Sequence, residues 1–161
     1  MQQKTFIFTA SEKLSNHPDF KLILEEFESY KKNSNDKEHP RPVNHIQRTT
    51  ASVSYYFGRD RFDIKHKQAR AEEIQHVHFR EENSLWEFDD GDPKAQWDCK
   101  SNTYLIYSYF YHNNCHYYFL IDLIEKNAHN NDNAIYIASA PGYLAQAQEY
   151  KSNIINPPPP I

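Results

Sequence analysis

The stretch TYLIYSYFYHNNCHYYFLIDLI, residues 103–124, decides the fold. It holds two runs rich in aromatic and β-branched residues, 103–111 and 116–124, joined by a short His-Asn-Asn-Cys connection. Because Asn tolerates a positive φ, the connection predicts a tight turn and the two runs predict a β-hairpin. Side chains alternate along a strand, so one face of the first run is expected to carry Leu105, Tyr107 and Tyr109, and one face of the second Tyr118, Leu120 and Asp122.

A strand and a helix are predicted before this hairpin. The β-branched and aromatic content of residues 5–9 predicts a first strand. Residues 18–32 are expected to form a helix, because Pro18 suits a first helical turn and Asn16 or His17 can cap it. The apolar stripe of this helix is expected to consist of Leu22, Ile23, Phe27 and Tyr30.

The middle of the chain alternates between loop signals and strand signals. Residues 33–48 are polar, contain two prolines and predict a loop. Residues 51–57 are rich in strand formers, and Gly58 is expected to end that strand in a turn. Residues 61–73 are strongly charged and predict an exposed loop or short helix, whereas residues 74–79 alternate as a strand.

The C-terminal part of the chain has helical and then proline-rich composition. Two helical pieces, 133–139 and 143–150, are expected on either side of Pro141-Gly142. Residues 151–161 end in four prolines, which predicts an extended, disordered tail. The order of elements predicts an α+β fold in a single domain over residues 1–150, with a small antiparallel sheet packed against an N-terminal and a C-terminal helix.

Composition narrows the class of protein. The chain has 161 residues, a net charge of −4 and a pI near 6.1, so it is not a generally basic nucleic-acid binder. The two cysteines, Cys99 and Cys115, form no metal or redox motif, and no apolar stretch suggests a signal peptide or a membrane span. These features predict a cytoplasmic, reduced protein.

Four residues form a candidate catalytic set. Arg59 and Asp60 follow Phe57-Gly58, and His76 and His78 lie two residues apart on the predicted strand 74–79, where both point to one face. A metal-free ribonuclease needs a base and an acid, which imidazoles supply, and a fixed cation for phosphate, which arginine supplies. Asp60 would then orient Arg59 or an imidazole.

The same residues allow other interpretations. His76 and His78 could form an ordinary half-buried polar strand face with hydrogen-bonded rings. They could also supply two ligands of a metal site completed by His112 or His116, although the sequence shows no recognisable third-ligand spacing. A non-enzymatic module that binds proteins through its aromatic sheet and proline tail is a further alternative.

Candidate RNA contacts lie close to this set. The basic side chains could contact phosphates, although interleaved acidic residues also fit a solvated loop. An aromatic ring in a polar stretch could stack on a base. The candidate RNA-binding residues are Arg61, Lys65, Lys67, Arg70 and Trp86.

Several short segments, taken in order, form a recognisable series: Phe57–Asp60, His76–Phe79, Trp86, Lys100–Tyr107, Leu120–Ile124 with Ala128-His129, and Leu144–Tyr150. This series resembles the YafO family of bacterial toxins, which belongs to the wider RelE-like group. Asn102 stands where the family usually has Asp, Asn127 replaces a proline, and residues 33–48 have no matching counterpart.

This resemblance implies a RelE-like fold and a toxin of a type II toxin–antitoxin system. It further implies an endoribonuclease that cleaves mRNA on the ribosome, inhibits translation and is neutralised by a cognate antitoxin. Cleavage would proceed by attack of the 2′-hydroxyl without a metal or other cofactor, and no membrane partner is expected.

Overall fold

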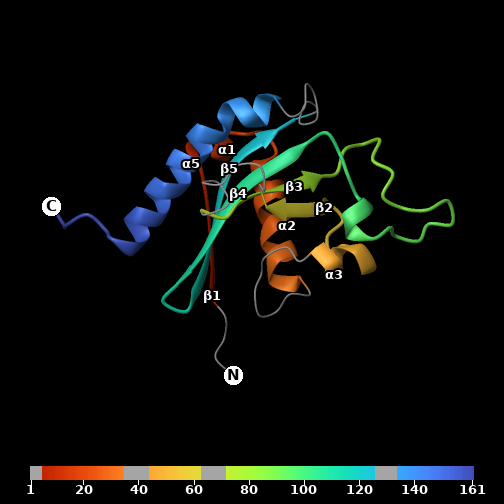
Figure 1. Ribbon diagram of the computed structural model, residues 1–161, viewed down its shortest axis with the longest axis horizontal. Coiled ribbons are helices and arrows are strands. Elements are labelled where there is room, and N and C mark those ends of the chain that lie inside the picture. The colour runs from red at the N-terminus through yellow and green to blue at the C-terminus, as the bar shows by residue number, and fades with distance from the viewer. Residues whose placement is uncertain (1–4, 35–43, 63–71, 126–133) are drawn as a thin grey trace.

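A computed structural model describes residues 5–34, 44–62, 72–125 and 134–161. Its centre is a five-stranded sheet in the order β1-β5-β4-β3-β2, and helices pack on both faces (Figure 1). The α+β fold predicted from the sequence is confirmed. The strands are β1 (Thr5–Ala10), β2 (Phe57–Phe62), β3 (Ile74–Phe79), β4 (Tyr104–His112) and β5 (Cys115–Ile124). The helices are α1 (Glu12–Ser15), α2 (Phe20–Asn33), α3 (Asn44–Thr49), the 3₁₀ helix η1 (Gln96–Asp98) and α5 (Ala134–Ile155).

The predicted hairpin forms the middle of the sheet. Strands β4 and β5 pair antiparallel from Tyr104↔Ile124 to His112↔Cys115. Asn113 and Asn114 connect them with φ values of 48° and 60°, the left-handed conformation that a two-residue hairpin turn requires. The two asparagines are therefore the local reason why this hairpin closes where it does.

The sheet is mixed, whereas an antiparallel sheet was expected. Strand β1 lies at one edge and runs parallel to β5, from Thr5↔Cys115 to Ala10↔Leu120. The chain then crosses the sheet through α2 and enters β2 at the opposite edge. Because β1 and β5 are far apart in sequence, no local turn fixes their relative direction.

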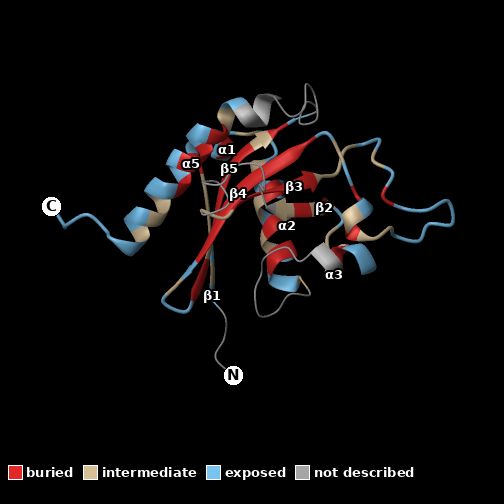
Figure 2. Ribbon diagram, in the orientation of Figure 1, coloured by how far each residue is buried: buried red, intermediate tan, exposed pale blue. Residues whose placement is uncertain are grey.

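Two separate apolar clusters cover the two faces of the sheet (Figure 2). One contains Phe27 and Tyr30 of α2 with Tyr107 and Leu120 of the central strands. The other contains Tyr143, Leu144 and Ala147 of α5 with Ile74 and Ile121 among the strand residues that it covers. We call these surfaces the α2 face and the α5 face.

A bulge in β5 moves one predicted residue to the other face. The pairing shifts between Ile106↔Asp122 and Tyr107↔Leu120, so Ile121 is the extra residue. Asp122 accepts a hydrogen bond from the Tyr143 hydroxyl of α5 at 2.6 Å. The prediction that Asp122 shares a face with Tyr118 and Leu120 was therefore wrong, because a bulge interrupts the alternation.

The N-terminal helix differs from its prediction in its start and its stripe. Helix α2 begins at Phe20 after Asp19, and the short α1, capped by the Ser11 hydroxyl, was not predicted. Ile23, Phe27 and Tyr30 are buried as expected, whereas Leu22 is exposed. Ile23, the residue after Leu22, faces the sheet in its place.

Helix α5 is continuous, whereas two pieces were predicted. It contains Pro141 and extends to Ile155, five residues beyond the expected helix end at 150 and into the range expected to be tail. Proline removes one helical hydrogen bond, but burial of the neighbouring residues Tyr143, Leu144 and Ala147 against the sheet holds the helix together. Residues 157–161 are exposed and have no regular structure.

The loop predicted over residues 33–48 contains helix α3 at its end, and the strand predicted over 51–57 is irregular. The Ser52 and Ser54 side chains hydrogen-bond to nearby backbone groups of residues 54–57, and these bonds compete with strand pairing.

Of the charged segment 61–73, residues 63–71 lie outside the described part. Among the residues described, no helix combines the length and apolar character that a membrane span needs.

Gly58 lies inside β2 and does not end a strand. A Cβ atom at this position would collide with the carbonyl oxygen of Cys99, whose backbone also accepts a hydrogen bond from Arg59 N at 2.9 Å. Glycine is therefore needed here because two backbone segments touch, and not because of a turn.

We expect Gly58→Ala to lower the free energy of unfolding by about 1–3 kcal/mol, because β2 must separate from Cys99. The matched control is Gly142→Ala in α5, where a new Cβ meets nothing within 4 Å and helix propensity should raise stability by about 0.5–1 kcal/mol. Urea denaturation measures both. Equal stability of Gly58→Ala and wild type would contradict the close approach.

Candidate functional site

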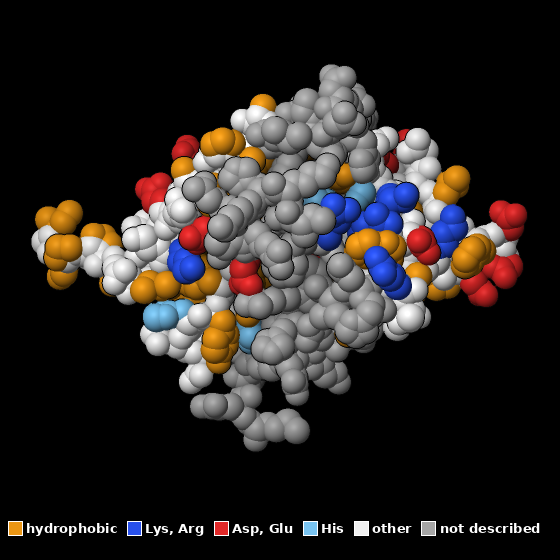
Figure 3. Space-filling view, viewed as in Figure 1, with side chains coloured by type: hydrophobic (Ala, Val, Ile, Leu, Met, Phe, Trp, Pro, Cys, Tyr) orange, Lys and Arg blue, Asp and Glu red, His pale blue; other side chains and the backbone are white. Residues whose placement is uncertain are grey.

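The α5 face of β2, β3 and β4 gathers the predicted histidines with two arginines. Arg61 of β2 pairs with His76 of β3, and His78 pairs with Tyr104 of β4. Paired residues of antiparallel strands point to the same face. Figure 3 shows His side chains next to Lys and Arg side chains over this end of the sheet.

Tyr104 lies between the two imidazoles. Its ring is stacked on His76 with a centroid distance of 4.6 Å and meets His78 edge-on at 4.6 Å. The imidazole centroids are 6.1 Å apart. His76 is 9% exposed and His78 is 2% exposed, so His76 lies nearer the surface.

The loop after η1 fixes the His78 ring. Its Nδ1 lies 2.8 Å from the amide nitrogen of Ser101 and 3.0 Å from the Ser101 carbonyl oxygen. Either backbone group can pair with Nδ1, depending on the tautomer. The ring orientation is therefore set by the backbone, and any proton exchange with a ligand would go through Nε2.

Arg59 is held against Trp97. Its Nε donates to the Trp97 carbonyl oxygen at 2.5 Å, and its guanidinium lies 4.2 Å from the centroid of the indole ring. Burial, and then the neighbouring charge of Arg61, lower the pKa of Arg59. An arginine remains cationic despite such a shift, so a fixed positive charge stands at this end of β2.

The two arginines also act on Tyr104. Burial raises the pKa of Tyr104 to about 12, and the charges of Arg61 and Arg59 oppose that rise. The phenol is therefore neutral near pH 7 and can donate a hydrogen bond. Tyr104 lies in the matching segment 100–107, but the sequence assigned it no role in the site, because its place beside the histidines depends on the β3–β4 register.

Asp60 does not perform the orienting role that the sequence suggested. Asp60 pairs with Val77, a member of the cluster under α2, and is fully buried on the α2 face, whereas its neighbour Arg61 pairs with His76 on the α5 face. It accepts hydrogen bonds from Lys31 Nζ at 2.7 Å and from the Tyr30 hydroxyl at 2.8 Å. The Tyr107 hydroxyl lies 2.8 Å from its other oxygen. The carboxylate thus belongs to a buried ion pair, on the opposite side of the sheet from the histidines.

The predicted RNA-binding residues separate into three groups. Arg61 lies in the site, next to His76. Trp86 is 2% exposed, with its Nε1 donating to the Lys100 carbonyl at 2.9 Å, so burial does not favour the stacking role suggested for it. Lys65, Lys67 and Arg70 lie outside the described residues.

The geometry separates His116 from the two candidate metal ligands. His116 bonds to the Tyr109 hydroxyl at 2.9 Å, and Tyr109 belongs to the α2 face. Within the described ranges, no three or more His, Cys, Asp or Glu side chains gather as a metal site would need. Cys99 and Cys115 are free and buried, and burial raises the pKa of Cys99 to about 11.

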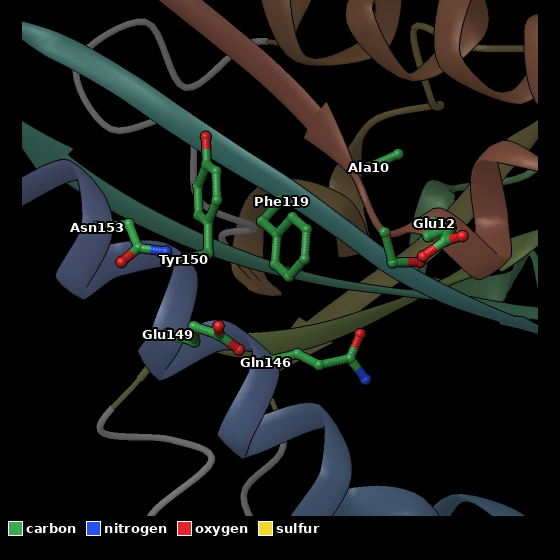
Figure 4. A pocket seen from close by; sticks show the side chains of 8 residues that line it. Ala10, Glu12, Phe119, Gln146, Glu149, Tyr150 and Asn153 are labelled. Atoms are coloured by element: carbon green, nitrogen blue, oxygen red, sulfur yellow. The ribbon is translucent and has the colours of Figure 1, made fainter. Parts of the chain in front are cut away.

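A groove of about 290 Å³ lies elsewhere, between α5, the end of β1, the start of α1 and Phe119 of β5 (Figure 4). Its polar lining includes Glu12, Gln146 and Glu149, and Tyr150 stacks on Phe119 with a centroid distance of 4.6 Å. None of the predicted site residues lines it. Its acidic side chains do not suit a phosphate ligand.

A comparison with protein-family models identifies the family. Residues 28–152 match the model described as toxin YafO of a type II toxin–antitoxin system. The match covers most of the chain, and the chain belongs to this family, as its motifs suggested. Membership implies a cognate antitoxin as a partner. Neither the curated proteins nor the solved structures contain a match to this chain.

We expect the Lys31–Asp60 pair to dominate the stability of this region. Lys31→Met leaves a buried, uncompensated carboxylate and should lower the free energy of unfolding by about 3–5 kcal/mol. The double variant Lys31→Met/Asp60→Asn removes both charges and should recover a large part of that loss. Urea denaturation of wild type, single and double variants measures the coupling, and strictly additive effects would contradict it.

Stability should fall in alkaline solution. Burial raises the pKa of Tyr30, Tyr107 and Tyr104 above the ordinary value of 10.0. The native state then holds protons that the unfolded state loses, so this stabilisation is complete below pH 10 and decreases above it. At pH values between 10 and its raised native-state pKa, each such tyrosine should lower the free energy of unfolding by about 1.4 kcal/mol per pH unit. Denaturation at several pH values measures this slope.

Tyr104→Phe is the control for the alkaline effect. This variant should show a smaller loss of stability above pH 10, because one of the buried phenols is absent. A free energy of unfolding that does not change between pH 10 and about pH 11 would contradict the prediction.

Proposed function

We propose that this toxin is an endoribonuclease that cleaves mRNA on the ribosome and inhibits translation, without a metal ion in the chemical step. The observation that carries the proposal is the grouping of His76, His78 and Tyr104 with Arg59 and Arg61 on one face of the sheet. Membership in the toxin family supports it. The mRNA, presented by the ribosome in the cytoplasm, is the proposed substrate.

The reaction needs two proton transfers around one phosphorus. A base removes the proton of the 2′-hydroxyl, and the 2′-oxygen attacks the phosphorus. The bond from phosphorus to the 5′-oxygen breaks, and an acid protonates that leaving oxygen. The products are a 2′,3′-cyclic phosphate and a 5′-hydroxyl end. Imidazoles suit both transfers near neutral pH, and we assign them to His76 and His78.

The arginines would stabilise the pentacoordinate intermediate. Negative charge develops on its equatorial oxygens, and fixed guanidinium groups lower the energy of that state. Arg59 is held in place by the carbonyl and ring of Trp97, so little reorganisation is needed. Arg61 pairs with His76 and lies on the same face of the sheet. Neutral Tyr104 could add a hydrogen bond to a phosphate oxygen.

The net charge of the protein supports the proposed ribosome dependence. With a net charge of −4, the chain attracts free RNA weakly, and a small group of arginines must act locally. A ribosome that presents the message removes the need for capture by charge. We therefore expect strong cleavage of translated message and weak cleavage of the same RNA alone.

The test is in vitro translation of a defined message with mapping of new 5′ ends. His76→Gln, His78→Gln and Arg59→Gln should each reduce the cleavage rate by about 100-fold or more, because each removes a group acting in the transition state. His112→Gln at the far end of β4 is the matched control and should cleave as wild type does. A bell-shaped pH profile should accompany cleavage by an acid and a base.

Other outcomes would overturn the proposal. Undiminished cleavage by His76→Gln and His78→Gln would assign the chemistry to other residues. Inhibition of translation by wild type without any new 5′ end would favour a binding module. Equal cleavage of free and translated RNA would contradict only the ribosome dependence and would leave the proposed cleavage in place.

A further inference from the structure

The ring of Trp97 contacts two guanidinium groups, those of Arg59 and Arg48. The Arg48 guanidinium of α3 lies 4.8 Å from the centroid of the Trp97 ring, and the Arg59 guanidinium lies 4.2 Å from it. Arg48 is exposed and Trp97 is half-buried. Two arginines from different elements therefore meet on one indole at the edge of the candidate site.

Buried amide side chains hold the elements that carry these residues. Gln47, beside Arg48, bonds through its side chain to the backbone N and O of Asp60 at 2.9 and 2.8 Å. Gln96, beside Trp97, donates through Nε2 to the Gly58 carbonyl at 2.9 Å. Gln47 and Gln96 thus tie α3 and η1 to β2, so the fold fixes the backbone of Arg48 and of Trp97 relative to that of Arg59.

Arg80 provides an internal comparison. Its guanidinium also packs on aromatic rings, 3.9 Å from the Tyr55 centroid and 4.6 Å from that of Trp86. Glu87 neutralises it through contacts of 2.8 and 3.3 Å. Arg80 is therefore a stacked arginine that has its own carboxylate.

Arg48, Arg59 and Arg61 differ from Arg80 in this respect. Across the described ranges, none of these three guanidiniums lies within ion-pair distance of a carboxylate. The charges of Arg61 and Arg48 lower the pKa of Arg59, whereas Asp98 and Tyr104 raise it. Like charges that the fold holds together in this way are stabilised by an anionic ligand.

We propose that Arg48 and Trp97, together with Arg59, bind the phosphate of a nucleotide next to the cleaved one. The RNA backbone would then leave the histidine-bearing face along η1 and α3. A guanidinium stacked on a ring keeps its N–H edge for bidentate contact with phosphate oxygens. Arg61 and Arg59 lie on β2, and Arg59 shares the Trp97 ring with Arg48, so the three form an arginine row that leads from the histidines to α3. This inference rests on the proposed function and names a subsite for its substrate.

The first test measures binding of a short single-stranded RNA whose 2′-hydroxyls are methylated, so that it cannot be cleaved. It is done with the free protein and with programmed ribosomes carrying the methylated message. Arg48→Gln should weaken binding about tenfold and reduce the slope of log affinity against log salt by about 0.7, the loss of one phosphate contact. Arg48→Lys keeps the charge but not the planar fork, and should fall between wild type and Arg48→Gln.

Lys21→Gln is the matched control. It removes one exposed positive charge from α2, outside the arginine row, and should bind as wild type does. Arg48 is exposed, so Arg48→Gln should unfold at the temperature of wild type. In cleavage assays Arg48→Gln should raise KM and leave kcat unchanged, whereas His76→Gln lowers kcat.

The outcomes separate this inference from the proposed cleavage. If wild type binds the methylated RNA, Arg48→Gln binds it about tenfold more weakly, and no message is cleaved, the subsite stands and the cleavage proposal fails. Equal binding by Arg48→Gln and wild type overturns the subsite, as does a wild type that binds neither preparation. A variant that loses affinity only for the antitoxin would assign the arginine row to a protein partner and also overturn it.

Discussion

The buried ion pair between Lys31 and Asp60 joins helix α2 to the edge strand β2, and the hydroxyl of Tyr107 ties both to the centre of the sheet. Lys31 Nζ also lies 4.7 Å from the ring centroids of Tyr30 and Tyr107. Two buried charges are tolerable only when hydrogen bonds and aromatic rings replace their lost hydration. Once Asp60 is fixed on this face, its neighbour Arg61, paired with His76, points to the other face.

The candidate site is therefore a consequence of alternation in three neighbouring strands. On one face of β2 and β3 lie Asp60 and Val77, which belong to the core under α2. On the other lie the arginines and histidines, with Tyr104 contributed by β4. The close contact of Gly58 with Cys99 brings η1 to the same edge, and with it Trp97. Strand β2, six residues long, thus contributes both to the core under α2 and to the proposed catalytic site.

Family membership and geometry support the proposal in different ways. The family match makes the chain a toxin of a type II system, and the arrangement of side chains suggests how such a toxin could act on RNA. The proposed subsite at Arg48 involves helix α3, which lies within residues 28–152, the range that matches the family model, although the short motifs read from the sequence did not include it.

The sequence by itself determined the hairpin, the strand with His76 and His78 on one face, and the α+β class, because these depend on local alternation and turn residues. The tertiary structure decided the parallel pairing of β1, the continuity of α5 through Pro141, and the partners of Asp60, Trp86 and Tyr104. Each of these is settled by contacts between residues far apart in the chain. A run such as Arg59-Asp60 shows which groups are present, but only the packing of α2 and η1 against β2 decides which of them faces a ligand.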